Sequence, residues 1–272
     1  MRLLFLGDVV GEPGLRLVCA AVPVLRRHEA LDLVVANAEN VCDGAGLAPS
    51  QFRRLRKAGV DAVTMGDHLF RKREIITLLT DPEPRVCRPA NLPAAAPGRG
   101  WIVVPAADGT PVGIISLLGR QYMKPADCPY AAAEAALADL EPRVRVKLVD
   151  FHAEATAEKV ALARWLDGRV SAFVGTHTHV ATADEQILAK GTAYLTDVGM
   201  TGPYDGVLGR RADRVIDYQR TGVPASFEVA VGDPRLAGVL IDVDTDNGRA
   251  LTIRRLALRP EELPRLSDET PP

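Results

Sequence analysis

The sequence predicts an α/β protein with a mixed sheet, or with two sheets packed between helices. In the first two thirds, short apolar runs rich in β-branched residues alternate with helical patterns, as in successive βα units. In the last third, predicted strands follow one another with turns between them. The chain has 272 residues, of which 47% are hydrophobic, so it can bury a large core.

The predicted elements follow from local patterns. Pro13 near a helix start and basic residues at its end predict the first helix, while Gly59 ends the second. The sequence Asp246-Asn247-Gly248 predicts a hairpin turn between the last two strands. The predicted strands are residues 3–6, 31–36, 62–65, 112–117, 146–149, 172–174, 192–195, 226–231, 236–243 and 251–256, and the predicted helices are 13–29, 49–58, 72–79, 130–140 and 156–166.

The chain is predicted to form one domain over residues 1–259. Residues 260–272 are rich in Pro, Glu and Asp, and we expect them to form a flexible C-terminal tail. No repeat and no interior linker interrupts the domain. The oligomeric state is left open, and a homo-oligomer is compatible with the sequence.

Composition excludes several classes of protein. Lys and Arg total 33 against 35 Asp and Glu, so no strong nucleic-acid-binding surface is expected. No apolar run reaches membrane-spanning length, and Asp8 cuts the first apolar stretch too early for a signal peptide. Four well-separated cysteines without a CxxC pair indicate reduced, mostly buried thiols in a cytoplasmic protein.

Polar side chains follow five of the predicted strands. In open α/β sheets, ligands bind outside the carboxyl ends of the strands, so we expect these side chains to converge. Four of the five histidines lie at such positions; His28, beside two arginines near a helix end, is interpreted as a surface residue. One such histidine would be explained by a structural hydrogen bond, but four favour a metal site. The strand-end residues are Asp8, Glu39, Asn40, Asp67, His68, His152, His177 and His179.

The types of these residues indicate metal-dependent hydrolysis. Seven of them, all except His68, are candidate ligands: three carboxylates, one amide and three imidazoles. Such a mixed set suits Mn²⁺, Fe or Zn²⁺ better than Ca²⁺, and seven ligands are too many for one tetrahedral zinc. They suit two ions about 3.5–4 Å apart, an arrangement that clamps both reacting oxygens in phosphoryl transfer.

Seven short segments strengthen this interpretation. In chain order they are LGDVVG (6–11), NAEN (37–40), TMGDH (64–68), RPAN (88–91), DFHAE (150–154), GTHTH (175–179) and TDVGMTGP (196–203). The ordered set resembles the YmdB-like family within the calcineurin-like metallophosphoesterases. The resemblance implies an α/β/β/α sandwich of two mixed sheets flanked by helices. It also implies hydrolysis of phosphodiesters, typically 2′,3′-cyclic mononucleotides, with iron or manganese as the metal.

The resemblance further implies a role for each strand-end residue. His68 would be the general acid, and it would need a hydrogen-bonded partner, which the sequence does not reveal, to keep its proton beside two cations. One ion would be held by Asp8, Glu39, Asn40 and His179, and the other by Asp67, His152, His177 and the same Glu39, which would bridge them.

Two positions depart from the usual patterns. Val10 stands where the broad superfamily has a histidine, which is normal in the YmdB-like branch. Asp67 stands where the family pattern has asparagine. The added negative charge predicts tighter metal binding and a less electrophilic centre, and hence a lower rate.

Three other interpretations compete. A dinucleotide-binding loop fails because Asp8 and Val9 occupy the place where its second glycine must admit the pyrophosphate. An amidohydrolase barrel usually carries His-x-His on its first strand, whereas here the pair, His177 and His179, comes late. A non-catalytic, metal-stabilised scaffold that binds a nucleotide or an RNA regulator stays open.

Several further residues have two readings at the sequence level. Thr178 could face a phosphate or turn back into its own strand. Arg210 and Arg211 could steer an anion or be solvated. Asp150 or Glu154, which flank His152, could hydrogen-bond to it and fix its tautomer, or neither residue could do so.

Overall fold

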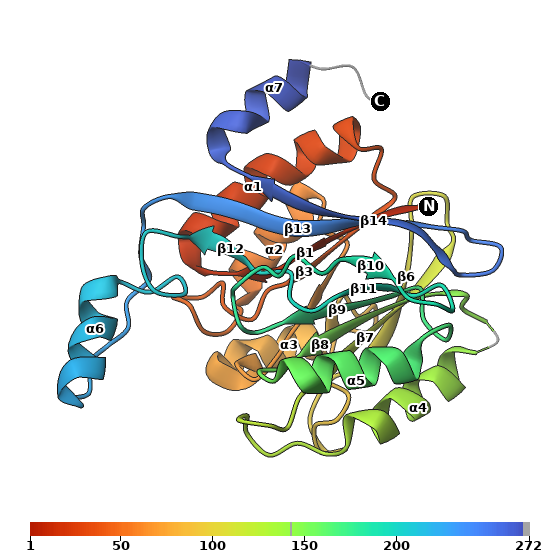
Figure 1. The fold of residues 1–272 in the computed structure, drawn as a ribbon, viewed down its shortest axis with the longest axis horizontal. Helices are drawn as coiled ribbons and strands as arrows, with labels where there is room; N and C mark the ends of the chain where they lie inside the picture. The colour runs from red at the N-terminus through yellow and green to blue at the C-terminus, as the bar shows by residue number, and fades with distance from the viewer. Residues whose placement is uncertain (142, 269–272) are drawn as a thin grey trace.

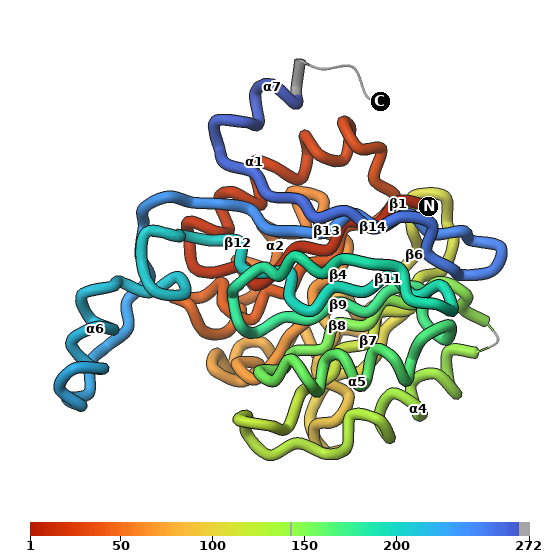
Figure 2. The backbone as a smooth tube through the Cα atoms, viewed as in Figure 1, coloured from red at the N-terminus to blue at the C-terminus, as the bar shows by residue number. Residues whose placement is uncertain are grey.

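The computed structural model describes residues 1–141 and 143–268. Two mixed sheets lie face to face with helices on both outer surfaces (Figure 1). The predicted α/β/β/α sandwich is therefore confirmed. Figure 2 traces the chain from its N-terminus in the first sheet, through the second sheet, and back to the first sheet near its C-terminal end.

The first sheet has the strand order β2-β12-β13-β1-β3-β4-β5, and β14 pairs with β13. β1 runs parallel to β3 and antiparallel to β13, so parallel and antiparallel pairs share one sheet. Its strands are β1 (Arg2–Leu6), β2 (Asp8–Val9), β3 (Leu33–Asn37), β4 (Ala62–Thr64), β5 (Val86–Cys87), β12 (Met200–Pro203), β13 (Pro234–Val243) and β14 (Ala250–Leu258).

The second sheet has the order β10-β11-β9-β8-β7-β6. β7, β8, β9 and β11 are parallel neighbours, and the antiparallel strands β6 and β10 form its edges. Its strands are β6 (Trp101–Pro105), β7 (Pro111–Leu118), β8 (Val146–His152), β9 (Ala172–Thr176), β10 (Gln186–Ile187) and β11 (Ala193–Leu195).

Burial on both faces explains why the central strands are continuous apolar runs. Phe5 and Val35 from the first sheet and Leu148 from the second belong to the core between the sheets. A second cluster packs the first sheet against α1 and α2, and a third packs the second sheet against α4 and α5. This three-layer core fixes both sheets, and with them the ends of their strands.

The helices match the predictions in most places. α2 and α5 have the predicted bounds, and α1 and α4 differ by one or two residues. The helices are α1 (Gly11–His28), α2 (Pro49–Ala58), α3 (Ile76–Leu79), α4 (Pro129–Leu140), α5 (Thr156–Leu166), α6 (Ala212–Thr221) and α7 (Leu263–Asp268), with 3₁₀ turns η1 (Leu69–Arg71), η2 (Arg73–Ile75) and η3 (Pro260–Glu262). No helix in the described ranges is both long enough and apolar enough to span a membrane.

Some predicted elements were wrong. The helix predicted over 72–79 is a 3₁₀ turn followed by the single turn α3, because Lys72 has an extended backbone. The strand predicted over 226–231 does not form; most of the segment is exposed, and only an isolated bridge joins Val229 to Arg210. An alternating pattern does not make a strand where no neighbouring strand is placed to pair with it.

Two C-terminal features were not predicted. α6 projects from the body of the protein with Ile216 and Tyr218 exposed, so it lacks the buried stripe by which helices are recognised (Figure 1). The flexible tail does not begin at residue 260, because η3 and α7 form there and Leu263 packs on the core cluster that contains α1. Residues 269–272 lie outside the described residues.

The cysteines are less buried than expected. All four are free thiols, as predicted, but only Cys87 is fully buried, and Cys19, Cys42 and Cys128 are partly exposed. Burial raises the pKa of Cys87 to about 12, so this thiol stays protonated at neutral pH.

Candidate metal centre

The structure brings all eight predicted site residues together at the carboxyl ends of five strands. The residues lie in or just after β1, β3, β4 and β8, and after β9. The strands come from both sheets, so the centre forms where the two layers meet. The residues, in that order, are Asp8; Glu39 and Asn40; Asp67 and His68; His152; and His177 and His179.

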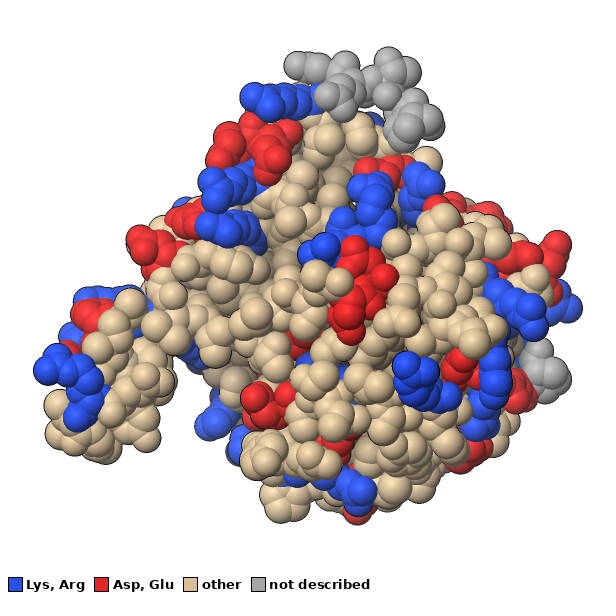
Figure 3. All heavy atoms as spheres, viewed as in Figure 1, with Lys and Arg blue, Asp and Glu red and all other residues tan. Residues whose placement is uncertain are grey.

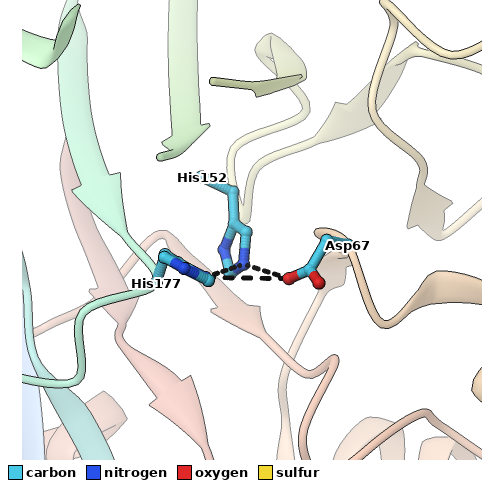
Figure 4. A group of neighbouring side chains, drawn as sticks. All are labelled: Asp67, His152 and His177. Carbon is cyan, nitrogen blue, oxygen red and sulfur yellow. Dashed lines mark hydrogen bonds and ion pairs between the residues drawn. The ribbon is translucent and has the colours of Figure 1, made fainter. Parts of the chain in front are cut away.

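One group of potential ligands consists of Asp67, His152 and His177 (Figure 4). His152 Nε2 lies 3.0 Å from His177 Nδ1 and 3.4 Å from Asp67 Oδ1. His177 Nδ1 lies 3.7 Å from the same Asp67 oxygen. One atom from each side chain therefore faces a common point, as metal ligands do.

A second group lies beside it and shares His152. It consists of Asp8, Glu39 and His152, with Glu39 Oε1 3.1 Å from His152 Nε2. Asn40 and His179 lie on the Asp8 side: His179 Nε2 is 3.2 Å from Asn40 Nδ2 and 3.9 Å from Asp8 Oδ1. Glu39 also forms a third group with Asp67 and His68, so it neighbours residues of both groups.

Two buried carboxylate oxygens show that the cluster fits a cation. Glu39 Oε1 and Asp67 Oδ1 accept no hydrogen bond from any residue that the structure describes, although both lie close to His152 Nε2. A buried carboxylate oxygen without a partner is costly. A cation bound between these oxygens and the imidazole nitrogens would satisfy both oxygens at once.

The pKa shifts reflect the concentration of buried negative charge. Burial raises the pKa of Asp8 to about 7. Burial alone would lower the pKa of His152, but the carboxylates, with Glu39 foremost, hold it well above its usual value. Burial lowers the pKa of His177 to about 4 and also lowers that of His179, so both imidazoles are neutral at pH 7, as metal ligation requires.

Hydrogen bonds orient His152 toward this cluster. Thr176 Oγ1 donates to Asp150 Oδ1 at 2.7 Å and lies 2.9 Å from His152 Nδ1. The hydroxyl therefore accepts the Nδ1 proton and turns Nε2 toward the carboxylates, where a bound cation would replace the Nε2 proton. Asn37 also donates to Asp150, at 3.1 Å. Asp150 thus acts on His152 through Thr176. Sequence reasoning gave Thr176 and Asn37 no role, because their contacts with Asp150 arise only when β3, β8 and β9 come together.

His177 and His179 lie on a strained stretch of backbone. His177 and His179 have φ values of 98° and 64°, which side-chain-bearing residues rarely adopt. The carboxylate of Asp197 accepts from the backbone N–H of Thr178 at 3.2 Å and from Thr178 Oγ1 at 2.8 Å. The Thr178 hydroxyl therefore turns toward Asp197. These two hydrogen bonds hold the loop that carries His177 and His179 in its strained conformation.

A buried ion pair completes this support, and sequence reasoning missed it. Lys159 Nζ lies 2.7 Å from Asp197 Oδ2 and donates to the carbonyl of Thr176 at 2.9 Å. Both charged side chains are 1% exposed. The only sequence signal is a lysine on the otherwise apolar side of a predicted helix.

His68 has the hydrogen-bonded partner that the sequence did not reveal. Its Nδ1 lies 2.7 Å from Asn40 Oδ1 and 3.2 Å from Glu39 Oε1. An amide oxygen only accepts, so Nδ1 carries a proton, while Nε2 lies 3.8 Å from Asp67 Oδ2. This geometry suits an imidazole that delivers a proton to a bound group.

The paired arginines do not face the centre. Arg210 donates to the carbonyls of Asp43 and Phe227 at 3.0 and 2.8 Å, so it joins two loops. Arg211 forms ion pairs with Asp213 and Glu228. By contrast, Glu154 Oε2 lies 3.3 Å from His177 Nε2, so Glu154 contacts a different histidine from the one considered above.

Comparison with known proteins identifies the family. The family model described as YmdB-like protein matches residues 4–256. The chain belongs to the YmdB-like family. The predicted family, the fold class and the class of phosphodiester hydrolase are confirmed.

Relatives within the YmdB-like family align over nearly their whole length. A 2′,3′-cyclic-nucleotide 2′-phosphodiesterase of Bacillus subtilis is 44% identical over 97% of this chain and 99% of its own. A putative phosphatase/phosphodiesterase of Mycoplasma genitalium is 34% identical over 95% and 93%.

Solved structures agree with this assignment. A hypothetical protein from Thermus thermophilus superposes with a TM-score of 0.89 at 41% identity, covering 95% of this chain and 99% of that one. A phosphatase from Mycoplasma pneumoniae superposes with a TM-score of 0.88 at 32% identity, covering 97% and 96%.

Proposed function

We propose that this protein is a binuclear metal-dependent phosphodiesterase that opens 2′,3′-cyclic mononucleotides. The observation that carries the proposal is the pair of buried, unpartnered carboxylate oxygens, Glu39 Oε1 and Asp67 Oδ1, on either side of His152 Nε2. The name of the Bacillus subtilis relative supports the substrate class. Iron or manganese is the proposed metal: the mixed oxygen and nitrogen donors suit Mn²⁺, Fe or Zn²⁺, and the family resemblance favours the first two.

The proposed ligands divide between two ions. Two divalent ions in such a site polarise the phosphoryl oxygens and activate the attacking water. Asp8, Glu39, Asn40 and His179 would hold one ion, and Glu39, Asp67, His152 and His177 the other.

The remaining chemistry belongs to the protein. Water adds its oxygen to phosphorus, the bond from phosphorus to O2′ breaks, and a 3′-monoester is formed. One proton of the water passes to solvent and the other stays on the phosphoryl group; the leaving O2′ takes a proton from His68, which regains one from solvent. His68 suits this step because Asn40 fixes its Nδ1 and leaves Nε2 beside Asp67 at the centre.

The test combines metal analysis with turnover. We expect about two metal ions per chain. Stripping with a chelator should abolish hydrolysis of the four 2′,3′-cyclic nucleotides, and Mn²⁺ should restore it. Full metal occupancy without turnover of any of the four would overturn the proposal and favour a metal-stabilised scaffold.

Replacing Asp67 with asparagine should weaken metal binding and raise the maximal rate. The substitution removes one negative charge from the centre, so each remaining ion is a stronger electrophile. Lys124 Nζ lies 3.7 Å from Asp67 Oδ2 and offsets part of that charge in the parent. Metal titration by calorimetry and kcat at saturating Mn²⁺ check both expectations. Equal metal affinity and equal kcat in the two proteins would contradict them.

We also propose a cytoplasmic location and self-association through α6. Four thiols without a disulfide in the described chain support the location. A projecting ten-residue helix with Ile216 and Tyr218 exposed is marginal in water by itself, which supports a second copy as its partner. Light scattering should give a mass above one chain for the parent and one chain for Ile216→Glu; a single-chain mass for the parent would refute self-association.

Acidic and basic side chains are interspersed over the face shown in Figure 3. This distribution supports a small phosphodiester as the substrate rather than a long nucleic acid, which needs a continuous basic surface.

A further inference from the structure

We propose that an apolar pocket beside the metal centre binds the base of the nucleotide, which stacks against the ring of Phe70. The inference rests on the proposed function and goes beyond it by assigning a site for the part of the substrate that does not react. The pocket has a volume of about 330 Å³, and Gly66 and Asp67 form part of its wall. It therefore opens directly from the candidate centre.

The walls of the pocket are largely apolar. Leu69 and Leu118 are 2% and 4% exposed, and Leu92 and Pro125 complete this surface. Concave, mostly apolar sites with a few polar groups are where small molecules bind. A flat, uncharged base would gain from such a surface, whereas the phosphate would not.

Phe70 gives the pocket an aromatic wall. It lies in η1, two residues after His68, and is 48% exposed although Leu69 beside it is buried. An aromatic side chain left in solvent next to a catalytic cluster is available for stacking. Base–aromatic stacking tolerates every base, because each presents a π-face.

Three charged residues, Asp67, Arg71 and Lys124, also line the pocket. Asp67 belongs to the proposed metal site, and Lys124 Nζ stands 3.7 Å from its Oδ2 with the lysine side chain 60% exposed. A phosphate would lie at the metal and Lys124 end. The base, about one ribose away, would reach the apolar surface and Phe70.

Gly66 joins the pocket to the metal centre by direct packing. A β-carbon at this position would collide with the ring of His152 and with Glu39 Oε2. Only glycine therefore fits between these two proposed ligands and the pocket that Gly66 lines.

The test compares a nucleotide with a base-free analogue. We expect Phe70→Leu, which stays apolar but loses the ring, to lower kcat/KM for 2′,3′-cyclic AMP about tenfold, mainly through KM. Hydrolysis of ribose 2,3-cyclic phosphate, which has no base, should be unchanged. Leu251→Ala, another exposed apolar truncation on β14, is the matched control and should change neither substrate.

The outcomes separate this inference from the function on which it rests. Equal losses for both substrates, or no loss for either, would overturn base stacking at Phe70 while leaving the phosphodiesterase intact. If the parent enzyme with bound metal hydrolyses neither substrate, the proposed function fails. Thermal melting of each variant shows whether a loss arises from unfolding instead, and a folded Phe70→Leu decides the question.

Discussion

Replacing His68 with alanine is expected to lower kcat by about 10²–10⁴-fold while leaving the metal content unchanged. The loss follows because the leaving O2′ would have to depart without a proton. Metal content should be retained, since His68 lies outside the seven proposed ligands and contacts them by its side chain, at Asn40 Oδ1 (2.7 Å), Glu39 Oε1 (3.2 Å) and Asp67 Oδ2 (3.8 Å), and through its backbone N–H to Glu39. Steady-state kinetics and elemental analysis on the same preparation measure both quantities.

Two comparisons sharpen this prediction. His28→Ala, at the far end of α1, removes the one histidine outside the cluster and should not change kcat. A substrate with a nitrophenolate leaving group needs little protonation, so His68→Ala should lose much less activity toward it than toward a cyclic nucleotide. Equal losses with both substrates would show that His68 acts on the metal site and not as the acid.

Replacing Lys159 with methionine is expected to destabilise the fold and to disrupt the metal centre at the same time. The substitution leaves Asp197 buried without its counter-ion, and breaking a buried pair in this way costs about 3–5 kcal/mol. It also removes the donor to the Thr176 carbonyl, 2.9 Å away, just before the loop that carries His177 and His179. That loop has unfavourable φ values and would relax without its support.

The measurement is denaturant unfolding with and without Mn²⁺, together with metal affinity. Lys57→Met removes a surface lysine from α2 and serves as the matched control, with a change expected within about 0.5 kcal/mol. The double variant Lys159→Met/Asp197→Asn should recover part of the stability, because it removes the uncompensated charge. If Lys159→Met unfolds like the parent and binds Mn²⁺ equally well, the supporting role of the ion pair is wrong.

The strand-end ligands could be predicted because they depend on local order along the chain. Five of the predicted strands are followed within a few residues by a carboxylate, an amide or an imidazole. Parallel strands deliver such residues to one edge wherever the strands pair. Asp8, Asp67 and His152 could therefore be assigned to one site without knowing which strands are neighbours.

The supporting contacts could not be predicted in this way. Thr176 and Asp150 lie 26 residues apart, and Lys159 and Asp197 lie 38 apart. A threonine in a strand or a lysine in a helix has no distinctive pattern until the fold brings its partner near. The same reason applies to α6, whose contact with the rest of the described chain includes the packing of Tyr218 against Phe227.

The sequence by itself determined the class of fold, the eight residues of the centre and the chemistry that their side chains allow. Those conclusions need only the period of apolar residues and the type of residue at each strand end. The tertiary structure decided how the centre is held together: Asn40 binding His68, Thr176 orienting His152, Lys159 supporting the His177 loop, and Phe70 facing a pocket beside Asp67. These relations join residues far apart in the chain, so packing of the two sheets, and not local pattern, creates them.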